Sequence, residues 1–393
     1  MSTTPVSTDL RGTPGIRFPG IPASHWVQSP GWDGFWMFAA IWGSLLLFGL
    51  GHTVGWQQAT TGLFIGNAFI AVFHSYSTTF MVLGSARMRA ARAEHPVKYV
   101  VIPLAIVALS MAVGIYTGLT LSFPRTARYG VELWPWVVYL GLFWLGHFFH
   151  FGKQDFGVLT LYRSRAGQHD DRSRQVDLAY SLAMMMAIQP IMYVSVGTGT
   201  PLGEAFYSFV PITPETMLTV ASAAFAFAFA ITLGVVCREI IRPNCSIPKL
   251  VYYAIMLAHP AVFYFVDTSF KYYFFTTYLW SHWFVAIGLV ARINVNGYRA
   301  SGKTTPRAQL RHWLTIGAIV GLVWWLIGGL DHLAVFSGRD YRQKLAEVTP
   351  EQSLFVGIVL GAFLAEQLVH YYCDRHLFRM RDPEIRQAIG PLL

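Results

Sequence analysis

The sequence predicts an all-α, polytopic transmembrane helical bundle of about ten spans. Of its 393 residues, 54% are hydrophobic, 16% are aromatic and only 12% are charged. That balance is unusual for a soluble protein but ordinary for a membrane bundle, in which aromatic side chains line both interfaces. The apolar stretches are also spread evenly along the chain, so one continuous domain is favoured over two or three soluble ones.

Ten segments are long and apolar enough to cross a bilayer, which takes about 20 residues as a helix. They are 34–55, 62–85, 99–123, 132–152, 176–198, 214–237, 248–268, 272–294, 312–336 and 353–376. Residues 1–33 form a polar N-terminal tail rich in Pro, Gly and Ser, without the apolar core of a signal peptide. We therefore expect a single transmembrane domain over 34–378 and a cytoplasmic C-terminal tail over 379–393.

The distribution of basic residues orients the bundle. Lys and Arg gather in the loops after the second, fourth, sixth and eighth segments, whereas the loops at 57–61 and 199–213 have almost none. Cytoplasmic loops carry this excess, so both termini are predicted to be cytoplasmic in a multi-pass protein of a bacterial-type inner membrane. The net charge of +9 is explained in the same way, and no nucleic-acid partner is expected.

Histidine is the most informative residue type, because seven of the thirteen histidines fall at positions that should lie inside the bilayer. They are His74, His147, His150, His259, His282, His332 and His370. An ionisable side chain at the centre of a membrane span costs roughly 2.5–3.5 kcal/mol on insertion scales, and such residues are usually functional. Most lie in the middle or cytoplasmic third of their spans, while His52 and His332 form a smaller outer layer.

The spacing of these residues suits metal binding. His147 and His150 are three residues apart, and Glu366, His370 and Asp374 follow one another at four-residue steps, so each set shares one helix face. Glu and His projected from facing helices build the di-iron carboxylate bundles. A mixed imidazole and carboxylate set suits Fe, Mn or Zn.

We therefore predict a buried metal centre with one or two iron ions. The expected ligands are His74, His147, His150, His259, His282 and His370. Glu366 is predicted as a further ligand or general base, and Asp374 and Asp155 as the groups that orient imidazoles. Other interpretations stay open: His282 could bond across helices, His259 could satisfy carbonyls freed by Pro260, and His74 could relay protons.

A short stretch of the sequence resembles a known family. Phe149-His150-Phe151-Gly152-Lys153-Gln154-Asp155 is similar to the F-H-x-G-x-x-D segment of the Brp/Blh carotenoid-cleaving dioxygenases. The match covers about a dozen residues, and the acidic residue expected soon after the early Gly51-His52 is missing. The resemblance implies a polytopic membrane protein whose histidines bind iron and use O2, more than it implies a carotene substrate.

The predicted function is an integral-membrane, non-haem iron oxygenase. Its O2 co-substrate would oxidise a lipophilic small molecule that arrives from the lipid bilayer, and the need for an electron donor and the oligomeric state are left open. The main alternative is a transporter that moves protons or metal ions along the same buried His and Glu residues. A haem protein with axial histidines is a third interpretation, and a purely structural protein fits poorly with so many costly intramembrane charges.

Overall fold

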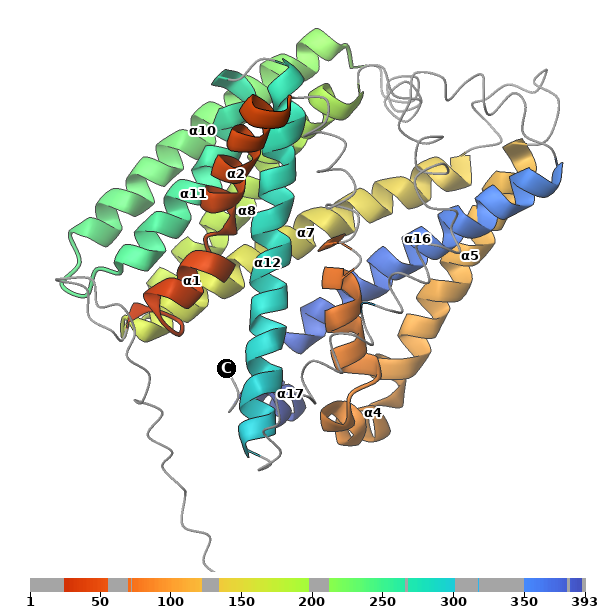
Figure 1. Ribbon diagram of the computed structural model, residues 1–393, viewed down its shortest axis with the longest axis horizontal. Helices are drawn as coiled ribbons and strands as arrows, with labels where there is room; N and C mark the ends of the chain where they lie inside the picture. Colours follow the sequence, from red (N-terminus) through yellow and green to blue (C-terminus); the bar gives the residue numbers. More distant parts are fainter. Residues whose placement is uncertain are drawn as a thin grey trace, which may run out of the picture.

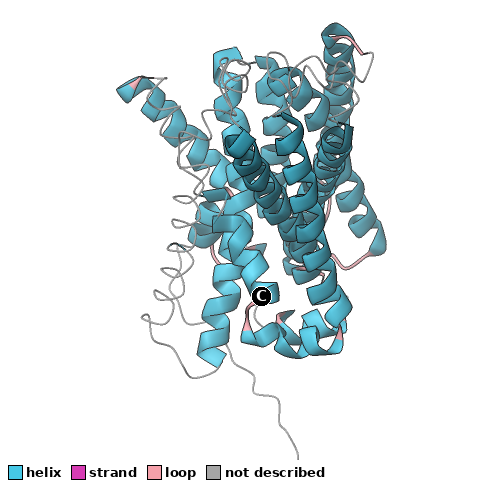
Figure 2. Ribbon diagram, turned by 90° about the vertical axis from the view of Figure 1, so that its right-hand side faces the viewer, coloured by secondary structure: helices cyan, strands magenta, loops and turns pink. Residues whose placement is uncertain are grey.

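The computed structural model describes residues 25–55, 70–71, 73–121, 134–197, 212–265, 268–300, 317, 350–379 and 382–390. Within these ranges there are eleven α-helices and no strand, which confirms the all-α class (Figure 2). The helices are α1 (Pro30–Trp36), α2 (Ala39–Val54), α4 (Arg89–Glu94), α5 (Ile102–Leu121), α7 (Trp134–Arg165), α8 (Asp171–Gly197), α10 (Pro214–Ile240), α11 (Ile247–Phe265), α12 (Thr268–Ala300), α16 (Pro350–Leu377) and α17 (Pro383–Ala388). Residues 73–83 are helical as well.

Two described helices are long and apolar enough to cross a membrane. One covers Val97–Leu119, through the π-helical turn Val97–Val101 into α5, and the other covers Glu215–Ile240 in α10. A third candidate is the pair α1 and α2, which is bent by 60° at a short break. These three agree in position with predicted spans. The total of ten stays a prediction, and the span at 312–336 lies outside the described residues apart from Gly317.

The outer faces of the long helices are apolar. On α7, Leu142, Leu145 and Phe149 are 56%, 54% and 59% exposed, although His150 beside them is buried. Large exposed hydrophobic side chains also line α5 and α10. Contiguous exposed apolar surface of this kind marks a contact with a membrane or another protein. Polar groups inside and apolar groups outside are the arrangement expected of helices that are surrounded by lipid.

Side-chain caps fix the start of the described fold. The Ser29 hydroxyl accepts the backbone N–H of Trp32 at 3.2 Å, where Pro30 opens α1. The buried Asp33 carboxylate accepts the backbone N–H groups of Val27 and Gln28 at 2.9 and 3.1 Å. These bonds satisfy donors that a helix start leaves free. The end of the predicted N-terminal tail is therefore packed against the bundle.

Glycine brings α16 against α5, and the two helices run side by side (Figure 1). A Cβ atom on Gly114 of α5 would overlap the backbone of Gly357 and Gly361 on α16. Small residues at a crossing let two membrane helices approach closely enough for extensive van der Waals contact. This packing matters for function because α16 carries His370.

A buried charge cluster joins α7, α8, α10 and α11, and we call it the lysine network: Arg163, Gln168, Asp177, Glu239 and Lys249. The Lys249 ammonium lies 3.0 Å from Asp177 and 3.2 Å from Glu239, and it donates to Gln168 at 3.1 Å. Arg163 pairs with the second oxygen of Asp177 at 3.3 Å. Two cations balance two anions, so the formal charge of the network is zero.

The C-terminal segment 379–393 includes α17, which packs on the bundle. Lys98 lies 2.7 Å from Asp382 and 2.9 Å from Glu384, while Ile385 and Ile389 are fully buried. The hydrogen bond from Lys98 lowers the pKa of the Glu384 carboxyl to about 2. The predicted tail is thus held by a small apolar core and an ion pair.

Candidate metal centre

Four helical segments each contribute one histidine to a single buried point. His74 comes from the helical residues 73–83, His150 from α7, His282 from α12 and His370 from α16. One ring nitrogen of each lies within 4.8 Å of the others, and the four residues are only 1–8% exposed. We call this group the four-histidine cluster. It is the one such group of metal-ligating side chains found among the described residues.

The spacing of the nitrogens is close to what a metal ion needs. His150 Nε2 lies 2.9 Å from His282 Nε2 and 3.2 Å from His370 Nε2. Nitrogen ligands at about 2.0–2.1 Å from a tetrahedral ion would be about 3.4 Å apart. These two pairs would need to open by only a few tenths of an ångström to surround an ion, and all four nitrogens lie within 4.8 Å of one another.

Hydrogen bonding within the protein does not account for all of these nitrogens. Neither ring nitrogen of His74, nor Nδ1 of His282, has a hydrogen-bond partner among the described residues, although all three atoms are buried. A buried polar atom without a partner costs about 1–3 kcal/mol, so each such atom needs an explanation. Four neutral imidazoles can turn lone pairs toward a shared cation, and the donor set fits Fe, Zn, Cu or Ni.

Thr78 orients His370. The Thr78 hydroxyl lies 2.8 Å from His370 Nδ1, and it can donate its own proton to the Ser75 carbonyl at 3.3 Å. Because a hydroxyl has one proton, Thr78 is then left to accept the Nδ1–H of His370. Nε2 of His370 keeps its lone pair and faces the cluster. Metal-ligating histidines commonly donate their second N–H in this way.

Two carboxylates on α16 lie one turn to either side of His370. Asp374 Oδ2 is 3.8 Å from His150 Nε2, and Asp374 Oδ1 is buried with no partner among the described residues. Glu366 accepts a hydrogen bond from Gln367 through Oε2, while its Oε1 is likewise buried without a described partner. The Asp374 carboxyl group, next to His150, could offset part of the charge of a cation at the cluster.

Aromatic rings pack directly on the cluster. The Phe151 ring stacks on His282 with centroids 3.6 Å apart and an interplanar angle of 12°. Tyr371 stacks on His150 at 4.6 Å and 27°. These rings limit the motion of the imidazoles and keep water away from them, which strengthens electrostatic interactions inside the site.

The structure places the other two predicted ligands, His147 and His259, outside the four-histidine cluster. His147 Nδ1 is hydrogen-bonded to the Tyr371 hydroxyl at 2.8 Å. His259 Nε2 is 3.3 Å from the Ser281 hydroxyl. His147 and His150 are three residues apart on α7. The His150 imidazole lies in the cluster, whereas the His147 imidazole contacts Tyr371 of α16.

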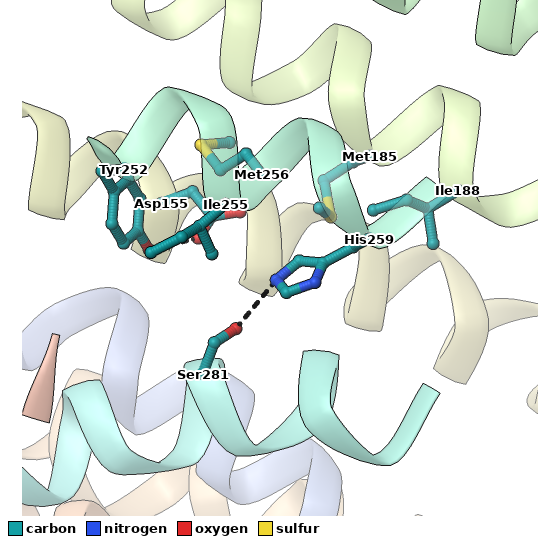
Figure 3. Close-up of a pocket in the computed structure, with 8 residues that line it drawn as sticks. All are labelled: Asp155, Met185, Ile188, Tyr252, Ile255, Met256, His259 and Ser281. Carbon is teal, nitrogen blue, oxygen red and sulfur yellow. Dashed lines mark hydrogen bonds between the residues drawn. The ribbon is translucent and has the colours of Figure 1, made fainter. Parts of the chain in front are cut away.

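Asp155 and His259 line a small cavity on the α11 side of the cluster (Figure 3). The Tyr252 hydroxyl donates to Asp155 Oδ1 at 2.7 Å, and Met185 and Ile188 add apolar walls. The hydrogen-bond partner of Asp155 in the described part of the chain is therefore a tyrosine, and the predicted role of orienting imidazoles stays a prediction. Asp155 lines this cavity together with Ser281, which directly precedes the cluster residue His282.

The sequence did not point to Thr78, whereas Gln154, one turn beyond His150, is predicted as a partner for imidazole N–H groups. Thr78 follows His74 by one helical turn in a run of hydroxyl residues, and that i, i+4 spacing was the available signal. Gln154 donates to the His282 backbone carbonyl at 2.6 Å, which ties α7 to α12 beside the cluster. His332 of the outer layer lies outside the described residues.

Protein-family models, curated proteins and solved structures were compared with this chain, and none of them matches it.

Proposed function

We propose that this protein is an integral-membrane, non-haem iron oxygenase with about ten spans and cytoplasmic termini, in a bacterial-type inner membrane. The observation that carries the proposal is the convergence of four buried imidazole nitrogens from four helical segments. No single helix could form that site, so its assembly depends on the tertiary fold. A purely structural role would leave the unpartnered nitrogens of His74 and His282 as an uncompensated cost.

His74, His150, His282 and His370 would hold the metal ion, and Asp374 would offset part of its charge. Iron with four nitrogen ligands keeps open positions at which O2 and an apolar substrate can react. Thr78 holds the His370 tautomer that presents Nε2. Phe151 and Tyr371 exclude water, which protects reactive oxygen intermediates from side reactions.

The exposed apolar faces of the helices support a lipophilic substrate that arrives from the bilayer. Phe149, on the outer face of α7, is 59% exposed and directly precedes the buried His150. A substrate dissolved in lipid can therefore approach within one residue of a metal ligand. The short Phe149–Asp155 resemblance to the carotenoid-cleaving dioxygenases supports the same chemistry. A dioxygenase would need no external electron donor, because both oxygen atoms enter the product.

Metal analysis of detergent-purified protein tests this proposal. We expect about one equivalent of iron without a haem Soret band, and O2 consumption that depends on an added lipophilic polyene. His282→Ala should lose both the iron and the O2 consumption. His95→Ala is the matched control, because the His95 side chain is 41% exposed and does not belong to the cluster. Metal-free protein from anaerobic, chelator-free preparations would refute the oxygenase and favour proton transport.

A further inference from the structure

Three basic side chains from three helices gather at the end of the bundle that is predicted to be cytoplasmic. They are Lys153 of α7, Arg174 in the first turn of α8 and Arg375 in the last turn of α16. All three are exposed, and α7 packs against both of the other helices. We call this group the basic triad.

The triad has no counterion in the described part of the chain. Partial burial lowers the pKa of the Lys153 ammonium, and the positive charges of Arg174 and Arg375 lower it further. The acids beside the triad are engaged elsewhere: Asp170 pairs with Arg242 of α10 at 2.7 Å, and Asp374 is buried beside His150. Arg174 also lies where the dipole of α8 is positive. An anion bound here would therefore relieve repulsion between three helix ends.

An exposed apolar stripe on α7 leads to the triad. Leu142, Leu145 and Phe149 are 56%, 54% and 59% exposed. Together with Lys153 they follow one another at steps of three, four and four residues, so the four side chains share one face of the helix. At a rise of 1.5 Å per residue, this face is about 16 Å long. An apolar stripe that ends in cations is complementary to a lipid with an acyl chain and an anionic head group.

We propose that the basic triad binds the head group of an anionic phospholipid, whose acyl chain lies along the α7 stripe. The site rests on the membrane location in the proposed function, but it contains none of the cluster histidines. Guanidinium groups bind phosphate oxygens through paired hydrogen bonds, and an ammonium adds a point charge. Basic pockets between the cytoplasmic ends of membrane helices bind head groups with more than one phosphate. Three unpaired cations therefore favour cardiolipin, which carries two phosphates, over a lipid with one. The bound lipid is the counterion that links α7, α8 and α16.

The test is a titration of delipidated full-length protein in neutral detergent with cardiolipin, followed by native mass spectrometry. Lys153→Gln, Arg174→Gln and Arg375→Gln should each weaken binding about fivefold, and the triple variant about 100-fold. Arg172→Gln is the matched control, because it removes the same charge from the same turn of α8. Residues two apart do not share a helix face, so that variant should bind cardiolipin like the wild type.

Two further ligands separate the head group from the chain. Phosphatidylcholine, which has no net charge, and inorganic phosphate, which has no chain, should both bind at least tenfold more weakly than cardiolipin. Inorganic phosphate that binds as tightly as cardiolipin would overturn the lipid assignment. Wild-type affinity in the triple variant, or an equal loss in Arg172→Gln, would overturn the assignment of the triad.

Iron content, measured on the same preparations, distinguishes this site from the metal centre. The triad variants should keep the iron of the wild type, because no ligand has been changed. If every preparation lacks iron, the oxygenase is refuted, and the cardiolipin affinities still decide for or against the lipid site.

Discussion

The lysine network and the four-histidine cluster are both buried among packed helices, yet their polar atoms are satisfied in opposite ways. In the network, both oxygens of Asp177 and Glu239 accept hydrogen bonds or ion pairs, and Lys249 has three partners. In the cluster, three buried ring nitrogens of His74 and His282 have none among the described residues. A network whose polar groups are all paired stabilises the fold, whereas the four-histidine cluster, with buried nitrogens that lack partners among the described residues, could hold a metal ion.

The difference also concerns charge. The network balances two cations with two anions, so it needs no further ion. The cluster combines four imidazoles, which are neutral when they act as ligands, with the nearby Asp374 carboxylate. A divalent cation bound there would have part of its charge offset by the carboxylate and would occupy the lone pairs of the imidazoles. The two regions should therefore respond to mutation and to metal in opposite directions.

The largest expected effect is on the network. Lys249→Met should lower the free energy of unfolding by about 3–5 kcal/mol, since Arg163 alone is then left to balance Asp177 and Glu239 and one buried negative charge is uncompensated. Denaturant unfolding in detergent measures this effect. Lys153→Met is the control: Lys153 lies on the exposed side of α7, and its loss should change stability by less than about 0.5 kcal/mol. Equal stability of the two variants would contradict a structural role for the network.

The cluster should show the opposite pattern. His282→Ala removes one ligand, so Fe²⁺ affinity should fall more than about 100-fold, beyond the usual cost of losing an outer-shell contact. The metal-free variant should unfold at the same temperature as the metal-free wild type, or higher, because an unpartnered buried nitrogen has been removed. At 100 times its dissociation constant, Fe²⁺ should stabilise the wild type by about 2.7 kcal/mol. A variant that keeps this gain would rule out His282 as a ligand.

Thr78→Val should have a smaller effect on the same site. The isosteric change removes the hydroxyl that holds His370, so metal affinity should fall by about 10–100-fold while the cluster stays assembled. Calorimetric titration with Fe²⁺ measures the change. Thr117→Val on α5 is the matched control, because the buried Thr117 hydroxyl donates to the Val113 carbonyl of its own helix at 2.8 Å. If both variants lose affinity equally, the orienting role of Thr78 is wrong.

The sequence could predict the helical class and a histidine site, because both leave one-dimensional signals. Apolar segments near 20 residues and histidines within them are visible without any knowledge of packing. Which imidazoles meet is a different question. His147 and His150 looked equivalent, and only the packing of α7 against α12 and α16 separates them. His150 points to the cluster and His147 to Tyr371.

The carboxylates illustrate the same limit. Asp155 lies one turn beyond His150 in sequence, which made it a natural partner for an imidazole, but Tyr252 of α11 reaches it instead. Thr78 sits 292 residues from His370, and no local pattern could join them. Contacts between distant segments depend on helix crossings, and those are fixed here by features such as the glycines between α5 and α16.

The smallest expected effect on stability is at the partly exposed ion pair between Lys98 and Glu384, which holds α17. Glu384→Gln should reduce stability by no more than about 1 kcal/mol, because Lys98 keeps Asp382 and solvent screens the pair. Hydrogen exchange at Ile385 and Ile389, which anchor α17, measures this change locally.

The pH dependence of α17 follows from the same contact. Lys98 lowers the pKa of Glu384 from 4.5 to about 2. The stabilisation from this carboxylate is therefore fully present above pH 4.5 and is lost as the pH falls toward 2. Hydrogen exchange at Ile385 and Ile389 should quicken over that interval in the wild type, beyond the intrinsic change in rate, and less so in Glu384→Gln. Identical profiles would show that the apolar contacts alone hold the helix. In that case the partly buried ion pair contributes nothing measurable, in contrast to the fully buried lysine network.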